Sequence, residues 1–166
     1  MKRFKHSVLL FLVLMALWAL LTPIMKDPGE LWVGLIVSAL VVLFTLRLEP
    51  VLGDLRLTPK ALAYSIAYIF VFIKELIVSN LDVARRVVNP KLPIKPGIVK
   101  VKTKLNSKIA KMILANSITL TPGTLTVDIK GEYLYIHWIE IQHEDLEGAT
   151  QDIVSKFEKY LEVIFG

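Results

Sequence analysis

Residues 7–22, SVLLFLVLMALWALLT, form an apolar run without a single charged side chain. Continued to residue 25, the run would make about 28 Å of helix, close to the thickness of a bilayer core. Three basic residues precede it, namely Lys2, Arg3 and Lys5. A cleaved signal peptide also begins in this way, but Trp18 and Leu20 occupy the expected cleavage zone and no small-x-small site follows. The sequence therefore predicts a retained membrane helix over residues 7–25.

A second apolar run, LWVGLIVSALVVLFTL, follows at residues 31–46 and predicts a helix over residues 31–48. Trp32 lies at its start, where interfacial aromatic residues are common, and Arg47 follows its end. The linking segment PIMKDPGE (residues 23–30) is short and contains helix breakers, so the two helices should pair as an antiparallel hairpin. The alternative is a buried hairpin in a soluble bundle, but each helix would then need a polar face, and neither run has one.

Residues 59–88 show a different pattern, in which polar residues recur at helical spacing. At about 100° per residue they fall in one stripe, with Lys74 and Arg85 beside it. The stripe consists of Lys60, Tyr64, Tyr68, Glu75, Ser79, Asp82 and Arg86. The remaining surface is apolar, and Thr58 followed by Pro59 is typical of a helix start. The sequence predicts a long amphipathic helix over residues 59–88.

The distribution of lysine and arginine predicts how these helices lie in the membrane, because cytoplasmic loops carry an excess of both. If the N-terminus is cytoplasmic and the third helix stays on that surface, nearly all basic residues lie inside and only Lys26 lies outside. A crossing third helix would also place Lys74 and Glu75 at membrane depth. We expect a membrane domain of residues 1–88 with two spans, an interfacial third helix and both termini in the cytoplasm. The alternative is a crossing third helix whose polar stripe packs on a partner.

A proline-rich linker at residues 89–97 leads to a C-terminal domain of ordinary composition at residues 98–166. Its first segment alternates between apolar and lysine side chains, which predicts a strand with one wet face. The predicted elements are a strand at residues 98–105, a helix at 107–116, strands at 124–129 and 132–141, and a helix at 146–164. The expected fold is a small cytoplasmic α+β domain with the element order β-α-β-β-α.

Two turns are expected around the last two strands. Pro122-Gly123 fits a type II turn, in which glycine supplies the positive φ. A two-residue turn at residues 130–131 then fixes the register of the hairpin. That register pairs Val127 with Leu134 and Leu125 with Ile136 on an apolar face, as a sheet packed against helices requires.

The composition excludes several classes of site. The chain has no cysteine, so cysteine-ligated clusters, disulfides and thiol catalysis are excluded. It has only 3 histidines, which do not cluster, so no metal site is expected. No phosphate-binding glycine loop, cofactor motif or supported catalytic triad is present. Three lysines on the first strand, Lys100, Lys102 and Lys104, have no stacking aromatic interleaved, which favours a solvated or headgroup-facing strand over a nucleic-acid surface.

The remaining polar residues offer little chemistry. Neither apolar span contains an ionisable residue, and an ion path through this chain alone would need one. His137 lies on a predicted strand, where a hydrogen-bonded structural histidine is favoured over a catalytic one. Four acidic residues lack metal spacing and predict a solvated loop and helix start. They are Glu140, Glu144, Asp145 and Glu147. No catalytic residue, cofactor or small-molecule substrate is predicted for the chain alone.

Two segments nevertheless carry a specific pattern: ANSITLTPGTLTVDI at residues 115–129 and LYIHWIE at residues 134–140. They closely resemble the E subunit of Mrp/Mnh-type multisubunit Na⁺/H⁺ antiporters, as does the order of hairpin, long third helix and small domain. The shared motif falls on Ser117, Thr119, Thr121, Pro122, Gly123, Thr124 and His137. These residue types indicate turn-forming and hydrogen-bonding positions that serve folding or assembly.

The resemblance implies an accessory, non-catalytic subunit of the cell membrane that supports Na⁺/H⁺ exchange, with the ion paths in the large antiporter-like subunits. Its implied partners are the other subunits of a hetero-oligomeric complex and membrane lipid, with no nucleic acid. Similar subunits are part of archaeal membrane-bound hydrogenase and sulfur-reductase complexes, so the same role in a redox-coupled, sodium-translocating complex is an alternative. A stand-alone membrane anchor or adaptor is a second alternative.

Overall fold

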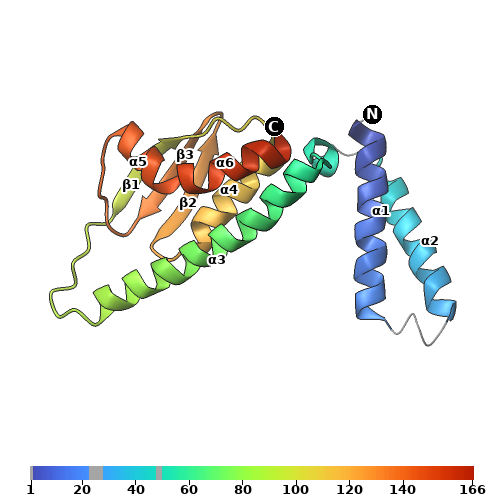
Figure 1. The fold of residues 1–166 in the computed structure, drawn as a ribbon, viewed down its shortest axis with the longest axis horizontal. Helices are drawn as coiled ribbons and strands as arrows, with labels where there is room; N and C mark the ends of the chain where they lie inside the picture. The colour runs from blue at the N-terminus through green and yellow to red at the C-terminus, as the bar shows by residue number, and fades with distance from the viewer. Residues whose placement is uncertain (1, 23–27, 48–49) are drawn as a thin grey trace. The chain divides into compact units, whose positions relative to one another are not determined.

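The structure is a computed structural model, and it describes residues 2–22, 28–47 and 50–166. Contacts between residues divide the chain into two units, Met1–Leu55 and Arg56–Gly166 (Figure 1). The predicted helix ends at residues 25 and 48 fall outside the described residues. The membrane domain of residues 1–88 stays a prediction, and the contacts group the third helix with the C-terminal elements.

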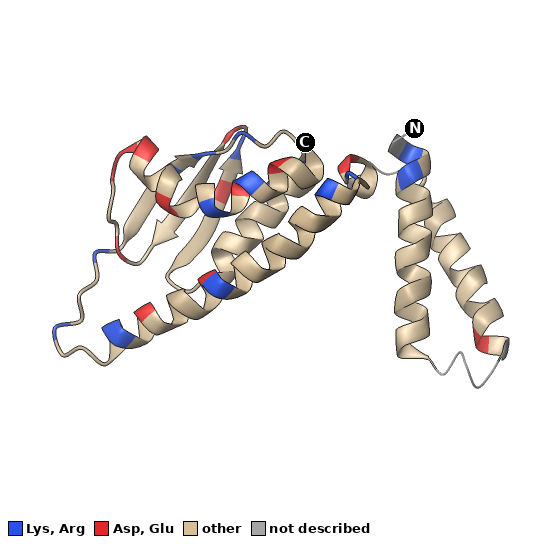
Figure 2. Cartoon of the chain, in the orientation of Figure 1, with Lys and Arg blue, Asp and Glu red and all other residues tan. Residues whose placement is uncertain are grey.

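The first unit is a pair of apolar helices followed by a short 3₁₀ helix. Its elements are α1 (Lys2–Leu21), α2 (Pro28–Thr45) and η1 (Val51–Asp54). The indole N–H of Trp18, near the end of α1, donates to the carbonyl of Glu30, near the start of α2, at 2.9 Å. The helices therefore run antiparallel, and their charged residues lie near the helix ends (Figure 2). The backbone N–H of Leu52 donates to Nδ1 of His6 at 3.2 Å and ties η1 to α1.

Gly34 of α2 lies against the ring of Trp18. A Cβ atom added at Gly34 would lie 2.6 Å from Cδ1 of the ring, which is closer than side chains tolerate. We expect Gly34→Val to destabilise the hairpin by about 1–3 kcal/mol, because overpacking forces the indole out of its site. Thermal unfolding of the purified chain in detergent measures this. Ala16→Val, at an exposed position of α1, is the matched control, and equal unfolding midpoints for the two variants would contradict the close packing.

The second unit begins with α3 (Pro59–Val87), whose bounds agree with the predicted third helix. Thr58 caps the first turn, because its side-chain oxygen accepts a hydrogen bond from the N–H of Ala61 at 3.1 Å. By length and composition, α3 and residues Arg3–Leu21 of α1 could each cross a membrane. The apolar part of α2, Gly29–Thr45, is shorter.

One side of α3 packs on the C-terminal helix, and the other side is exposed. The ring of Tyr64 lies 6.0 Å from that of Tyr160, and the ring of Phe72 lies 6.4 Å from that of Phe157. The exposed side is lined by large apolar side chains: Leu62, Ile66, Ile69, Phe70, Ile73, Ile77 and Leu81. Most of the polar stripe therefore faces protein, which reverses the usual arrangement of a surface helix in a soluble domain.

The remaining elements form a three-stranded antiparallel sheet with helices on one face (Figure 1). In chain order they are β1 (Gly97–Lys102), α4 (Lys108–Leu120), β2 (Thr124–Lys130), β3 (Tyr133–Trp138), α5 (Leu146–Ile153) and α6 (Ser155–Phe165). The strand order is β1-β3-β2. Helix α5 packs on β1 and α4 on β2, while α6 contacts α3, α4 and α5. The core between sheet and helices includes Val101, Leu114, Ile118, Leu134, Ile136, Phe157 and Leu161.

The predicted order β-α-β-β-α differs from the observed one at the end of the chain. The closing helix predicted over residues 146–164 is divided at Val154 into α5 and α6. The hydroxyl of Ser155 donates to the carbonyl of Thr150 at 3.3 Å, and such bonds compete with the helical backbone ladder. The hydroxyl oxygen of Thr150 also accepts from the N–H of Lys102 at 2.9 Å, which holds α5 on β1 while α6 packs on α3.

The predicted register of the β2–β3 hairpin is wrong. Leu134 pairs with Ile129 instead of Val127, because Gly131 takes the first central position of the turn with a φ of +62°. The ladder also shifts by one residue at Val127, as in a β-bulge. Val127 and Leu125, expected on the buried face, are therefore exposed by 54% and 50%.

Candidate functional site

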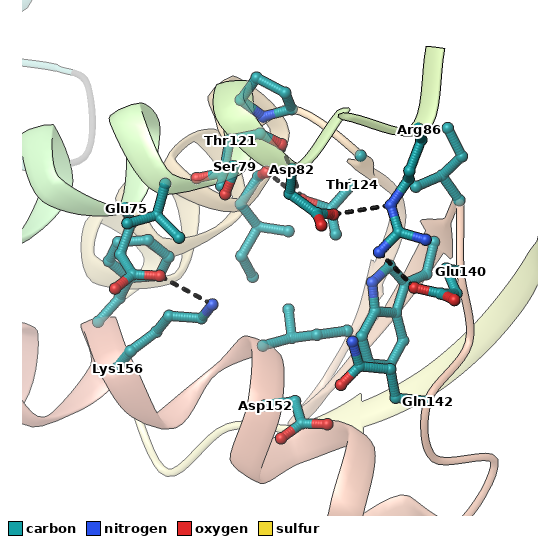
Figure 3. A pocket seen from close by; sticks show the side chains of 18 residues that line it. Glu75, Ser79, Asp82, Arg86, Thr121, Thr124, Glu140, Gln142, Asp152 and Lys156 are labelled. Carbon is teal, nitrogen blue, oxygen red and sulfur yellow. Dashed lines mark hydrogen bonds and ion pairs between the residues drawn. The ribbon is translucent and has the colours of Figure 1, made fainter. Parts of the chain in front are cut away.

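Six of the seven motif residues lie where α4 turns into β2, beside α3. Helix α4 continues to Leu120, past its predicted end at residue 116, so the first part of the motif is helical. A cavity of about 280 Å³ opens at this turn, between α3, the end of β3 and the helices α5 and α6 (Figure 3). Four motif residues line it: Thr121, Pro122, Gly123 and Thr124.

Ser117 joins the motif to α3. Its side chain is buried, and its hydroxyl donates to the carbonyl of Ile113 at 2.8 Å within α4. The same hydroxyl is hydrogen-bonded to the phenolic hydroxyl of Tyr68 on α3. Ser117 is buried and Tyr68 is half-buried, so separating the two helices would break this bond and leave its hydroxyls to be rehydrated or unpaired.

The threonines of the motif close the end of α4, where helical carbonyls have no partner in the next turn. The hydroxyl of Thr121 donates to the carbonyl of Ser117 at 2.7 Å. The hydroxyl of Thr124 lies 2.7 Å from the carbonyl of Ile118 and 2.9 Å from that of Thr121. Thr119 acts in the opposite sense, since its hydroxyl oxygen accepts from the backbone N–H of Thr126 at 3.1 Å. These bonds fix β2 against the helix that precedes it.

Gly123 has the positive φ that the sequence predicts, at +92°. Its carbonyl accepts from the backbone N–H of Ile139 at 2.9 Å, so the turn is attached to the segment after β3. A Cβ atom at Gly123 would lie 3.1 Å from Cγ2 of Ile139. Both the backbone conformation and the close approach therefore favour glycine here.

His137 lies apart from the other motif residues. It is on β3, paired in register with Ile98 on one side and Leu125 on the other, and its side chain is exposed. The structural hydrogen bond expected for His137 is not found among the described residues.

The sheet and its helices, residues 97–166, are called the sheet domain below. Two groups of charges join α3 to the sheet domain across the same cavity (Figure 3). Lys156 of α6 contacts Glu75 at 3.0 Å. Arg86 lies 2.8 Å from Asp82 and also pairs with Glu140, at the end of β3. The Glu75 and Arg86 side chains are only 16% and 14% exposed, but their partners Lys156, Glu140 and Asp82 are exposed by 36%, 32% and 51%. These pairs are therefore only partly shielded from water.

The sequence pattern favoured a solvated acidic loop for Glu140 and did not single out Lys156. No sequence signal joins either residue to its partner, because Glu75 and Lys156 are 81 residues apart. The other acidic residues of that loop agree better with expectation. Lys95 lies 2.7 Å from Glu144 and lowers the pKa of that carboxyl group. The backbone N–H of Gly148 donates to Asp145, which caps α5, and lowers the pKa of Asp145.

The arrangement holds α3 against the sheet domain and offers little for chemistry. Glu75, Asp82 and Glu140 each have a cationic partner. Asp152, which also lines the cavity, lies 2.7 Å from His143. Within residues 2–22, 28–47 and 50–166, no three His, Asp or Glu side chains are grouped to hold a metal ion. The cavity lies between α3 and the sheet domain, and its polar side chains include the ion pairs that join the two.

A family model for a Na⁺/H⁺ ion antiporter subunit matches residues 11–164. The E subunit of a Na⁺/H⁺ antiporter from Bacillus subtilis (strain 168) is 45% identical over 97 residues, which are 57% of this chain and 60% of that protein. The E subunit of a probable K⁺/H⁺ antiporter from Rhizobium meliloti (strain 1021) is 29% identical over 159 residues, 95% of this chain and 94% of that protein. The chain thus matches about three fifths of the length of the first relative and nearly all of the second.

A solved structure is similar over almost the whole chain. It is a chain of the membrane-bound sulfane sulfur reductase, an archaeal respiratory membrane complex. The two chains are 48% identical and superpose with a TM-score of 0.83, covering 96% of this chain and 99% of that one.

Proposed function

Because the chain belongs to the Na⁺/H⁺ ion antiporter subunit family, we propose that it is the accessory, E-type subunit of a multisubunit cation/proton antiporter module. The match of the family model to residues 11–164 carries this proposal, since it includes the helices, the motif and the sheet domain. In this role the chain holds larger subunits in place and does not itself catalyse a reaction or conduct ions.

The first unit supports a role without an ion path. A cation crossing a bilayer core needs oxygen ligands or titratable groups at depth, because bare charge in hydrocarbon is costly. The apolar runs of α1 and α2 offer only hydroxyls. Three of these are bonded to carbonyls of their own helix: Ser7 to Arg3, Thr22 to Trp18 and Thr45 to Val42. Such hydroxyls are poorly placed to line a pore.

The second unit supports an α3 that lies along the membrane surface. Its polar stripe is packed on the sheet domain through Tyr68, Glu75 and Arg86. Its opposite side is apolar and exposed, as in helices that lie in the interfacial plane of a bilayer. A crossing α3 would either carry the charged sheet domain into hydrocarbon or break these contacts. The proposed topology is therefore two spans, an interfacial α3 and a cytoplasmic sheet domain.

Cysteine labelling tests this topology, because the chain has no cysteine of its own. Leu57 precedes α3 and Lys91 follows it, and both side chains are exposed. We expect Leu57→Cys and Lys91→Cys to react with a membrane-impermeant maleimide only in inside-out vesicles. Labelling of the two positions from opposite sides of the membrane would mean that α3 crosses.

Ion flux tests the function. The purified chain in liposomes is expected to move neither sodium nor protons above the protein-free background. The complete assembly should exchange them, and the assembly purified without this chain should lose most of that activity, recovering it when the chain is added back. Flux through the isolated chain would refute an accessory role, and full exchange by an assembly lacking the chain would refute a supporting one.

A second candidate is the same accessory role in a redox-coupled membrane complex. The 48% identical chain of the sulfane sulfur reductase complex favours it, because that similarity includes both units. Identifying the proteins that copurify with this chain in mild detergent distinguishes the candidates. Partners with redox cofactors would support the second, and antiporter-like subunits alone would support the first.

A further inference from the structure

The sheet has an outer face, turned away from α4 and α5, that the proposed function leaves unused. Its side chains form three rows across the strands, set by the register of β1, β3 and β2. The rows are Ile98–His137–Leu125, then Lys100–Tyr135–Asp128, then Lys102–Tyr133–Lys130. We refer to these residues as the outer sheet face. Helices α4 and α5 pack on the inner face of the sheet, and α6 lies between them and α3, so the outer sheet face points away from the apolar side of α3 (Figure 1).

The first row is apolar around His137. Ile98 and Leu125 are exposed by 61% and 50%, and nearby Val127 by 54%. No described residue makes a hydrogen bond to the imidazole of His137, although His137 belongs to the sequence motif. Exposed apolar patches with a polar rim mark interaction sites in many proteins.

The other two rows are basic and aromatic. No aromatic residue is interleaved with the lysines of β1 in the sequence, but the register places Tyr133 and Tyr135 beside them. Lys102 has a carboxylate partner in Glu132 at 3.4 Å. Lys100 has none among the described residues, and its Nζ atom lies 3.7 Å from the ring centroid of Tyr133. The contact with the ring holds the ammonium group near Tyr133 and leaves its charge without an anionic partner among the described residues.

We propose that the outer sheet face is a docking surface for another protein subunit of the assembly. That partner presents a carboxylate to Lys100 and an apolar side chain to the row around His137. The inference rests on the proposed function, since it requires an assembly. A free phosphate fits less well, because it cannot cover Ile98 and Leu125. A lipid surface fits less well, because the outer sheet face points away from the apolar side of α3.

Zero-length carbodiimide cross-linking of the purified assembly tests the charged contact, because it joins an amine to a carboxylate in direct contact. We expect a cross-link from Lys100 to an Asp or Glu of another subunit, and its loss in Lys100→Gln. Lys159, exposed on α6, is the matched control and should give no such link. Lys100→Glu should weaken retention of the chain in the assembly about tenfold, since it places like charges together.

A cysteine at His137 tests coverage of the apolar row. His137→Cys should react with maleimide several-fold more slowly in the assembly than in the isolated chain, whereas Glu147→Cys on α5 should react equally in both. Equal reactivity at position 137, in a chain that still copurifies with its partners, would overturn the inference and leave the proposed function standing. Protection that disappears when lipid is removed from an intact assembly would also overturn it, in favour of a lipid contact. A chain that copurifies with nothing would instead overturn the proposed function.

Discussion

Replacing Gly123 by valine is expected to destabilise the second unit and remove the chain from its assembly. The φ of +92° at Gly123 is strained for any residue with a side chain, at a cost of about 1–3 kcal/mol. The added side chain would also meet Ile139, whose Cγ2 atom lies 3.1 Å from the position of the new Cβ. The bond between the Gly123 carbonyl and the N–H of Ile139 would weaken as the turn moved. Thermal unfolding followed by circular dichroism, and the amount of chain in the purified assembly, measure the two effects.

Gly131→Val is the matched control for this variant. Gly131 also has a positive φ, at +62°, but a Cβ atom there would meet no other atom within 4 Å. The control should therefore be strained without being crowded, and should remain in the assembly. If both variants unfold at the same temperature, crowding against Ile139 has no effect. If Gly123→Val assembles fully and changes only the pH or sodium dependence of exchange, the turn has a direct part in transport.

Reversing the charge of Lys156 is expected to loosen α3 from the sheet domain. Lys156→Glu would remove the cation that lies 3.0 Å from Glu75 and place a second carboxylate on the same side of the cavity. The Glu75 side chain is only 16% exposed and would lose its partner, while the side chain at position 156 is 36% exposed, so water would relieve part of the repulsion; we expect a loss of about 1–3 kcal/mol of stability. Chemical unfolding of the purified chain in detergent measures it.

The charge swap separates this contact from a general effect of the substitution. Glu75→Lys combined with Lys156→Glu should recover most of the lost stability, because the pair is restored with its signs exchanged. Lys130→Glu, which reverses an exposed pair with Asp128, is the matched control and should change stability little. If the double variant loses as much stability as the two single variants together, the contact contributes nothing to holding α3.

The effect on assembly follows from the same contact. If α3 must lie on the sheet domain to place both on the membrane surface, Lys156→Glu should also reduce the amount of assembled complex, and the swap should restore it. Unchanged assembly in a demonstrably destabilised single variant would show that partners can hold α3 without the sheet domain.

Patterns local in sequence correctly predicted the elements that depend on neighbouring residues. The two charge-free runs predicted the helices α1 and α2, because a long apolar run that ends at charges or helix breakers is recognised from neighbouring residues alone. Thr58 and Pro59 predicted the start of α3, because capping involves only the first turn. Gly123 predicted a positive φ, because few other residues tolerate one. The resemblance of the motif to one family was likewise recognisable from two short segments, residues 115–129 and 134–140.

The hairpin register and the division of the closing helix were not predicted. The hairpin register depended on which turn position Gly131 takes and on a bulge at Val127, and neither leaves a distinct pattern in composition. The closing helix is divided because α5 is attached to β1 and α6 to α3.

In the candidate site, too, some features were predicted from the sequence and others were decided by the tertiary structure. The sequence by itself predicted a polar stripe and an apolar side for α3, because both follow from residue spacing along one helix. Only the tertiary structure decided which side is covered. It placed Ser117 against Tyr68, Lys156 against Glu75, and Glu140 against Arg86. Those pairings depend on how the sheet domain folds back along α3, and helical periodicity contains no information about partners that lie dozens of residues away.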